Sequence, residues 1–379
     1  MKRMQTHAKQ TVKHLVGQSL IRTGLWERLL RTWARRKEVI ILAYHRVISA
    51  WDRTLDYSQP GMVITAETFE YHMRFLKEHF DVVPLSLFAE LPAAPPGQRP
   101  FRASGCSQRP AFRRPLCAIT FDDGWRDNYE IAFPILRRYD LPATIFLTTD
   151  FIGTDRVFWH TELLYLLLHE GLSGSRQDFP GFRTYPAPVR QGLRRLARMR
   201  VPRQAQDADS LVEAVKETCD EDRIEGLIRD LAESIGLSRP LFPGRRFFLD
   251  WNQVREMAAA GIEIGSHSCS HRILTRLPQS DVEMELRRSK EVIEGQTWAR
   301  ADFFAYPNDA CNRSICSLTK AVGYQAACNG EGKVLTAVGP YALQRIGVHE
   351  GLAACDGPNH RGAGLAFVLA KRAFCKAIW

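Results

Sequence analysis

The stretch that decides the fold is LCAITFDDG, residues 116–124. Its first six residues form an unbroken apolar and β-branched run, which is typical of a strand buried on both faces. Asp122, Asp123 and Gly124 follow at once, which indicates that the strand ends there. A helix is expected near 128–138 and another apolar strand at 143–148, so the order is strand, helix, strand. The sequence therefore predicts an α/β fold with a parallel sheet.

The same rhythm recurs on both sides of this stretch. Upstream, VIILA at 39–43 predicts a short buried strand, and apolar residues at helical spacing predict a helix over 65–79. The pattern continues downstream with further segments. The strands expected there lie at 262–265, 302–306, 324–327 and 343–348, and the helices at 253–260 and 280–294. Over 160–247 the β pattern gives way to Leu, Ala, Arg and Glu at helical spacing, which predicts a mainly helical insertion.

These segments suggest a domain organisation. We expect a basic amphipathic helical segment at 1–38, a main α/β domain at 39–350 and a helical tail at 351–379. Within the main domain, residues 92–115 are rich in Pro, Arg, Gly and Ser without an apolar period, which predicts a surface loop of low order.

Composition is that of an ordinary globular protein, but its charge is not balanced. The chain has 379 residues, a formal net charge of +10 and nine cysteines without a CxxC pair. The excess charge alone would fit a nucleic-acid partner, but we expect none because nothing else in the sequence supports it. The cysteines suggest buried apolar residues in a reducing compartment rather than a disulfide framework.

Much of the positive charge lies at the N-terminus. No stretch reaches the roughly 18 consecutive apolar residues that a spanning helix needs, and no leader-like segment is recognisable, so we expect a cytoplasmic protein. Two interpretations of the N-terminus stay open. The basic helix could lie on the inner membrane as a peripheral anchor, or it could pack one apolar stripe on the domain. The stripe consists of Leu15, Leu20, Leu25, Trp26, Leu29, Leu30 and Trp33.

A second polar motif, HSCSH at 267–271, follows another predicted strand. His267 and His271 are four positions apart and can converge on one cation, and a carboxylate from the Asp122–Asp123 pair would complete a three-ligand site that leaves room for water. The other aspartate would then act as general base. A lone Asp-Asp-Gly is usually a turn and a lone HxxxH usually a packing feature. Their joint occurrence at the ends of two apolar strands favours a catalytic metal site.

The two motifs, TFDDG and HSxxH, resemble the fingerprint of the polysaccharide deacetylase (NodB-homology) family, carbohydrate esterase family 4. The similarity extends to LAYHRV at 42–47, FDDGWRDNY at 121–129 and FAYP at 304–307, and so covers roughly 39–350 without the helical insertion. The resemblance implies a distorted parallel (β/α) barrel of the TIM-like, NodB-homology type.

The resemblance also implies roles for individual residues. Asp122 would be the catalytic base, and Asp123, His267 and His271 would hold a divalent metal ion, with zinc as the expected identity. Tyr306 would offer its backbone N–H to the oxyanion that develops during reaction, since an aimed amide stabilises that charge.

Other candidates depend on a looser match. His349 is the nearest equivalent of the family's general acid, with a plain loop histidine as the alternative. An arginine of the family's third motif is missing, and Arg345 could replace it beside Asp122 or contact substrate. His45 would bind substrate or carry protons, unless it is a core histidine, and Trp125 would stack on a sugar ring.

The function expected from the resemblance is metal-dependent hydrolysis of N-acetyl groups on N-acetylhexosamine units. The substrate would be an N-acetylated oligo- or polysaccharide of bacterial exopolysaccharide or cell-surface biosynthesis. Two alternatives remain: an amidohydrolase for a small non-sugar amide, and a catalytically inactive carbohydrate-binding relative. Release of acetate from glycans separates both from the main hypothesis.

Overall fold

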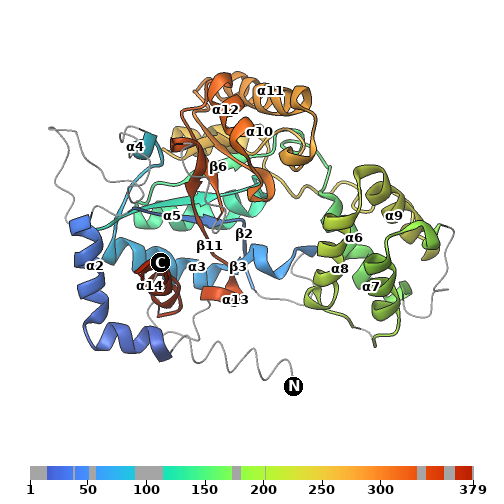
Figure 1. Ribbon diagram of the computed structural model, residues 1–379, viewed down its shortest axis with the longest axis horizontal. Helices are drawn as coiled ribbons and strands as arrows, with labels where there is room; N and C mark the ends of the chain where they lie inside the picture. Colours follow the sequence, from blue (N-terminus) through green and yellow to red (C-terminus); the bar gives the residue numbers. More distant parts are fainter. Residues whose placement is uncertain are drawn as a thin grey trace. The chain divides into compact units, whose positions relative to one another are not determined.

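The computed structural model describes most of the chain (Figure 1). The described residues are 15–36, 39–50, 57–89, 114–172, 181–200, 202–330, 339–353 and 363–377. The chain forms two compact units. The barrel unit comprises Met1–Ser49, Ile64–Thr154 and Phe248–Trp379, and the helical unit comprises Ala50–Val63 and Asp155–Phe247. Most of the loop expected at 92–115 and part of the tail expected at 351–379 lie outside the described residues.

The barrel unit is built on one sheet of parallel strands. In their order across the sheet the strands are β10 (Leu343–Gln344), β9 (Ala326–Asn329), β8 (Phe303–Ala305), β7 (Glu263–Ser266), β6 (Thr144–Leu147), β5 (Leu116–Phe121), β1 (Val39–Tyr44) and β11 (Ile346–Gly347). A further short strand, β4 (Asp81–Val82), pairs with β5. The short β2 (Arg46–Ile48) and β3 (Val63–Thr65) form a separate two-stranded sheet. All six residues of β5 are buried, as its apolar sequence predicts.

The two ends of this sheet are joined by one short segment, 343–347. Its first half, β10, pairs with β9, and its second half, β11, pairs with β1 in the register Leu42 to Ile346. Only Arg345 lies between the two strands. The sheet therefore closes on itself, which confirms the expected distorted parallel (β/α) barrel.

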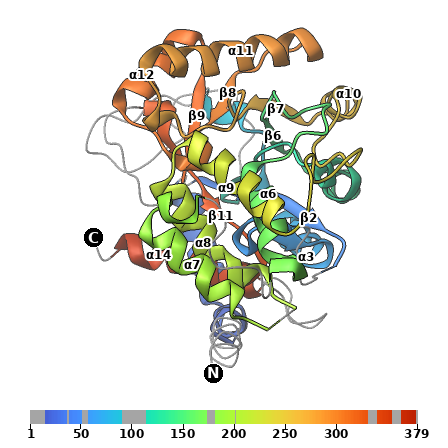
Figure 2. The same cartoon turned by 90° about the vertical axis from the view of Figure 1, so that its right-hand side faces the viewer.

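Helices connect the strands and cover the sheet. They are α3 (Ala66–His79), α4 (Ser86–Ala89), α5 (Phe133–Tyr139), α10 (Trp251–Ala259), α11 (Gln279–Thr297), α12 (Arg313–Val322) and α13 (Glu350–Ala353). Figure 2 shows α11 and α12 beside each other on the outside of the sheet, where α11 contacts β7 and α12 contacts β9. Several ends have side-chain caps: Asp250 accepts hydrogen bonds from the N–H groups of Asn252 and Gln253 and so begins α10. The crossover pattern expected from the sequence is present.

The N-terminal part of the barrel unit adds α2 (Leu25–Arg36), and the C-terminal part adds α14 (Ala363–Ala377). Trp26, Leu30 and Trp33 of α2 are buried. The ring of Trp26 lies 5.4 Å from that of Phe75, and the ring of Trp33 lies 6.4 Å from that of Phe80. These members of the apolar stripe therefore pack on the domain and are not available to insert into lipid. None of the helices in the described ranges has the length and apolarity needed to cross a bilayer.

The helical unit has a hydrophobic core of its own. Its helices are α6 (Trp159–Leu168), α7 (Ala187–Ala197), α8 (Ala205–Thr218) and α9 (Glu221–Ser234). Leucines of α6, among them Leu163 and Leu167, pack with buried residues of the other three helices. The expected helical insertion at 160–247 falls within this unit, which also takes in residues 50–63.

Packing inside the barrel makes a prediction at Gly265 of β7. A Cβ there would lie 2.6 Å from Phe146 Cδ1 and 2.9 Å from the carbonyl oxygen of Phe303. We expect Gly265→Ala to lower the free energy of unfolding by about 1–3 kcal/mol because these neighbours must shift. Gly347→Ala in β11 is the matched control, since a Cβ there meets no described atom within 4 Å. Denaturant unfolding measures both, and equal stabilities of the two variants would contradict this account of the packing.

Candidate active site

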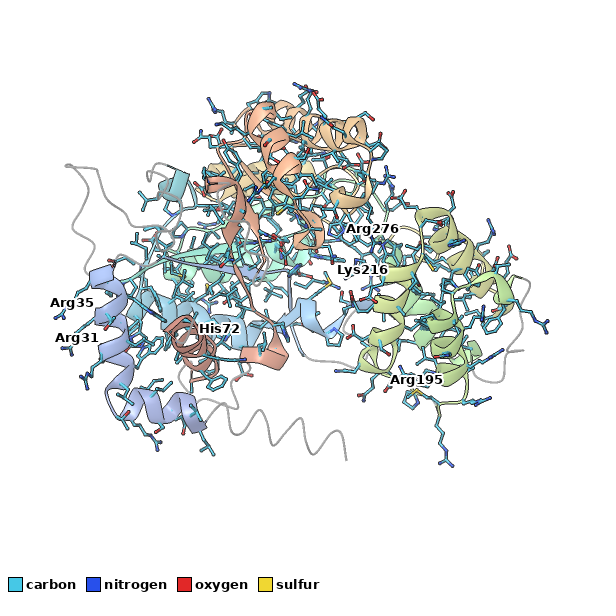
Figure 3. All side chains as sticks on the ribbon, viewed as in Figure 1. Arg31, Arg35, His72, Arg195, Lys216 and Arg276 are labelled. Atoms are coloured by element: carbon cyan, nitrogen blue, oxygen red, sulfur yellow. The ribbon has the colours of Figure 1, made fainter. Side chains whose placement is uncertain are left out.

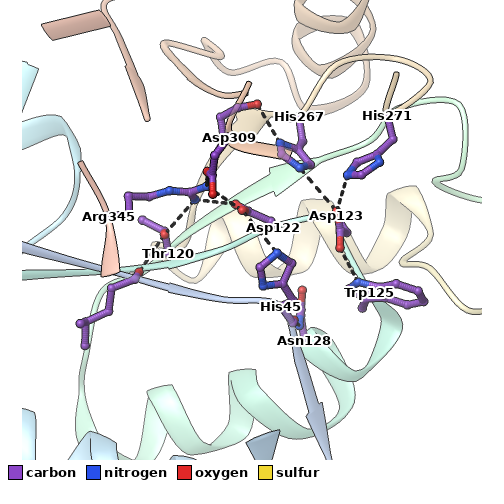
Figure 4. A network of polar contacts seen from close by, with 12 residues as sticks. His45, Thr120, Asp122, Asp123, Trp125, Asn128, His267, His271, Asp309 and Arg345 are labelled. Atoms are coloured by element: carbon purple, nitrogen blue, oxygen red, sulfur yellow. Dashed lines mark hydrogen bonds and ion pairs between the residues drawn. The ribbon is translucent and has the colours of Figure 1, made fainter. Parts of the chain in front are cut away.

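The polar residues that the sequence singles out gather at one edge of the barrel. Asp122 and Asp123 follow β5, His267 follows β7, and His45 follows β1. Because the strands are parallel, their carboxyl ends meet at the same edge, where barrel enzymes place their catalytic groups. Figure 4 shows these side chains converging from their separate strands.

Three of the side chains can bind one cation. One ligand atom each from Asp123, His267 and His271 lies within 4.8 Å of the others. Asp123 Oδ1 is 3.5 Å from His267 Nε2 and 3.3 Å from His271 Nε2. The same oxygen is buried and has no hydrogen-bond partner among the described residues. A buried carboxylate oxygen facing two imidazole nitrogens fits a divalent metal, and three protein ligands leave positions open for water.

The orientation of His267 suits this role. Its Nδ1 lies 2.7 Å from the carbonyl oxygen of Ala305, so Nδ1 carries the proton and Nε2 keeps its lone pair toward Asp123. Burial, followed by the charges of His271 and Arg345, lowers the pKa of His267 and outweighs the opposing effect of the two aspartates. The neutral form that a metal ligand needs is thereby favoured.

Asp122 lies next to the three candidate metal ligands and is held by Arg345. Arg345 donates to both of its oxygens, at 2.6 Å and 2.7 Å, and His45 Nε2 lies 3.8 Å from Oδ2 (Figure 4). Burial by itself raises the pKa of Asp122, but the charges of Arg345, His267 and His45 together with the Arg345 hydrogen bonds lower it overall. The carboxylate is therefore ionised at neutral pH and can accept a proton.

The loop that carries both histidines is anchored by Glu285 of α11. This buried carboxylate accepts hydrogen bonds from the N–H groups of Cys269 and Ser270, at 2.8 Å and 3.0 Å, and from the hydroxyl of Ser270. Two residues of the loop have left-handed backbones, Ser268 (φ 68°) and His271 (φ 63°), which cost free energy unless the surroundings fix them. Sequence reasoning missed Glu285, because a glutamate 14 residues beyond His271 on a helix gives no local signal.

The backbone N–H of Tyr306 is not free to act as the expected oxyanion donor. Its backbone N–H already donates to the carbonyl oxygen of Cys328 at 3.2 Å, as part of the pairing of β8 with β9. Its hydroxyl is buried and donates to the carbonyl oxygen of Tyr341 at 3.0 Å. The expected oxyanion donor is thus engaged in the sheet. Pro307 has no N–H, so the next residue along the chain that can donate is Asn308, which is exposed and left-handed (φ 55°).

Two residues expected to bind substrate are buried instead. Trp125 is fully buried, so its ring cannot stack on a sugar. Arg345 is also buried, and its guanidinium pairs with Asp122. Of the two roles expected for Arg345, the structure therefore supports orientation of Asp122 and not contact with substrate. His45 keeps 28% of its side chain exposed beside Asp122. His349 lies half-buried just beyond β11, and its role as general acid stays a prediction.

Comparison with known proteins identifies the family. Residues 110–327, more than half of the chain, match the family model described as polysaccharide deacetylase. The chain belongs to the polysaccharide deacetylase family. A curated relative, "Putative polysaccharide deacetylase YxkH" of Bacillus subtilis (strain 168), is 22% identical over 235 residues, which are 62% of this chain and 52% of that protein. The match thus spans about half the length of that relative.

The chain also resembles solved structures. The Streptococcus pyogenes deacetylase PplD in complex with acetate is 14% identical, with 83% of this chain and 93% of that chain covered and a TM-score of 0.48. IcaB from Ammonifex degensii is 14% identical, with 87% and 96% covered and a TM-score of 0.47.

The anchoring carboxylate makes a prediction about the histidine loop. Glu285→Met removes the acceptor of the buried Cys269 N–H and of the half-buried Ser270 N–H, and each group left unpaired in the interior costs about 1–3 kcal/mol. We expect a matching loss in the free energy of unfolding. Glu285→Gln keeps one oxygen as acceptor for both N–H groups, so this variant should retain most of the wild-type stability. Glu291→Met, at an exposed position of the same helix, is the control. A Glu285→Met protein as stable as this control would show that the loop does not depend on the carboxylate.

Proposed function

We propose that this protein hydrolyses N-acetyl groups on N-acetylhexosamine units of a glycan, with the help of a divalent metal ion. One observation carries the proposal. In a chain that belongs to the polysaccharide deacetylase family, an ionised carboxylate, Asp122, lies beside a three-donor set made of Asp123, His267 and His271. Such a set fits a cation with open positions, and a spare carboxylate beside it fits a general base.

In this mechanism the divalent ion, Asp122 and Arg345 have different roles. The chemistry that a divalent ion such as zinc supplies here, when bound, is a lower pKa for the attacking water and a polarised acetyl carbonyl. Asp122 accepts a proton from the water that adds to the acetyl carbon. Arg345 fixes both oxygens of Asp122, so the carboxylate is already oriented before substrate arrives. The C–N bond then breaks and yields acetate and a free amine.

The leaving nitrogen must gain a proton as the C–N bond breaks. His45 and His349 are the candidates for this donor. His45 lies next to Asp122 and is partly exposed, so it can face both the site and solvent. His349 is half-buried after β11, at the carboxyl end of a neighbouring strand. A loss of turnover in His45→Gln or His349→Gln, with metal affinity unchanged, would assign the donor.

The substrate we propose is an N-acetylated oligo- or polysaccharide of bacterial exopolysaccharide or cell-surface carbohydrate biosynthesis. Membership of the polysaccharide deacetylase family supports a glycan as the substrate. The test is release of acetate from defined N-acetylglucosamine oligosaccharides, before and after chelator treatment and with zinc added back. Acetate from simple amides but not from glycans would favour a small-molecule amidohydrolase. No chelator-sensitive acetate from any glycan would favour an inactive carbohydrate-binding protein.

Two substitutions separate the base from the ligands. Asp122→Asn should lower turnover by about 100- to 10,000-fold and leave metal content unchanged, because Asn still offers one oxygen to Arg345. His271→Ala should lose metal together with activity. His169→Ala, in the helical unit, is the control for loss of an imidazole. Elemental analysis of the purified proteins measures the metal, and full metal content in His271→Ala would remove His271 from the ligand set.

We also propose that the protein is cytoplasmic and contacts the inner membrane through α2. With Trp26 and Trp33 buried, the solvent-facing side of the helix carries Arg28, Arg31 and Arg35. Figure 3 shows Arg31 and Arg35 projecting outward from α2. Leu15 and Leu25, exposed by 59% and 48%, lie on the same N-terminal segment. A basic helix face with exposed apolar residues favours anionic lipid headgroups.

This membrane contact can be tested with vesicles. Each arginine near an anionic surface contributes about 1 kcal/mol. Replacing Arg28, Arg31 and Arg35 together by Gln should therefore weaken binding to phosphatidylglycerol-containing vesicles by about 100-fold. The same change at the exposed arginines 194, 198 and 200 of the helical unit alters net charge equally and should leave binding intact. Co-sedimentation measures both, and equal effects of the two triple variants would exclude a specific role of α2.

A further inference from the structure

The buried Trp125 makes one polar contact with the metal-site carboxylate. Its indole N–H donates to Asp123 Oδ2 at 2.7 Å (Figure 4). The other oxygen, Oδ1, is the one that faces His267 and His271. Asp123 itself has a left-handed backbone (φ 75°). The two oxygens of one carboxylate thus have different partners.

Aromatic and charged groups fix the indole ring. Phe248 stacks on it, with ring centroids 4.6 Å apart and planes 23° from parallel. The guanidinium of Arg46 lies 4.5 Å from the ring centroid. Arg46 is buried and paired with Asp127, whose Oδ2 lies 2.8 Å from both Nε and Nη2 of the arginine. Asp127 Oδ1 accepts the N–H of Val47 at 3.0 Å, so the ion pair is tied to the backbone of β2.

We infer that Trp125 is a positioning residue that makes Asp123 a one-oxygen ligand. A carboxylate free to use both oxygens could occupy two positions around a cation, and one of these is needed by water in a catalytic site. The indole N–H occupies Oδ2 and leaves only Oδ1 for the metal. Groups that hold the unused atom of a ligand usually contribute 10- to 100-fold in metal affinity.

Arg46 reinforces this hydrogen bond. A cation over an aromatic face is attracted by the electrons of the ring and draws them toward itself. The N–H of that ring then becomes a stronger donor to a carboxylate. The buried Arg46–Asp127 pair thus acts on the metal site through Trp125.

The alternative is that Trp125 only fills space, and a matched pair of variants separates the two. Trp125→Phe keeps an aromatic ring against Phe248 and removes the N–H. Trp26→Phe makes the same change at another fully buried tryptophan, whose Nε1 has no hydrogen-bond partner among the described residues. The measured quantity is the dissociation constant for zinc, by competition with a chromophoric chelator, together with the melting temperature of each metal-free protein.

We expect Trp125→Phe to bind zinc about 10- to 100-fold more weakly than the wild type, and Trp26→Phe to bind it equally well. Equal zinc affinity of Trp125→Phe and wild type would overturn the inference. The inference rests on the metal site of the proposed function, and the experiment keeps the two apart. A wild-type protein that does not bind zinc refutes the metal site, whereas a wild type that binds it and a variant that binds it as well refute only the role of Trp125.

A measurement on the wild-type protein covers the case in which Trp125→Phe does not fold. The chain has eight tryptophans, and 15N labelling of their indoles gives one N–H signal for each. Paramagnetic cobalt in place of zinc shifts the indole N–H nearest to the cation most strongly, which assigns Trp125 without a substitution. Zinc should change the chemical shift of this signal because the cation withdraws charge from the carboxylate that accepts the hydrogen bond. Zinc saturation without a change in any indole signal would overturn the inference.

Discussion

The buried ion pair between Arg345 and Asp122 connects the closure of the barrel with its chemistry. Arg345 is the one residue between β10 and β11, the two short strands that join the ends of the sheet. Its guanidinium reaches inward, over the ring of Phe146, and donates to both oxygens of Asp122. Removing one member of such a buried pair typically costs about 3–5 kcal/mol, because the other charge is left without compensation. Asp122, the proposed base, is therefore oriented only when the barrel is closed.

The donor set depends on a shell of less conspicuous groups. Asp123, Ser268 and His271 all have left-handed backbones, a conformation that non-glycine residues adopt at a cost. Hydrogen bonds to Glu285, Ala305 and Trp125 fix the side chains and the loop around them. Strain of this kind persists only where the surroundings determine the geometry, and that is the condition a preorganised metal site requires. The site is therefore a property of three strands and of α11 together.

The main elements were predictable because each has a strong local pattern. The run 116–121 is apolar throughout and became β5, and the apolar spacing of 65–79 became α3. The segment 343–348 was expected as one strand, but it is divided at Arg345 because its halves pair with different neighbours. The three candidate metal donors were predictable because two polar motifs directly follow apolar strands, and parallel strands bring their carboxyl ends to one edge.

Other parts of the site were not predictable, since they depend on contacts distant in the sequence. The backbone N–H of Tyr306 was expected to donate to the oxyanion, but it donates to the carbonyl oxygen of Cys328 where β8 pairs with β9. Trp125 was expected to stack on a sugar ring, but its indole packs between Phe248 and the guanidinium of Arg46. The support that Glu285 gives to the histidine loop has no local sequence pattern at all.

The sequence by itself thus determined which residues stand at strand ends and which of them carry carboxylates and imidazoles, because strand periodicity and residue chemistry are local properties. Only the tertiary structure decided how these groups divide their work: which oxygen of Asp123 stays free, which arginine orients Asp122, and which N–H groups are already used. These outcomes depend on which segments become neighbours when the barrel closes, and burial then leaves each polar group only the partners within its reach.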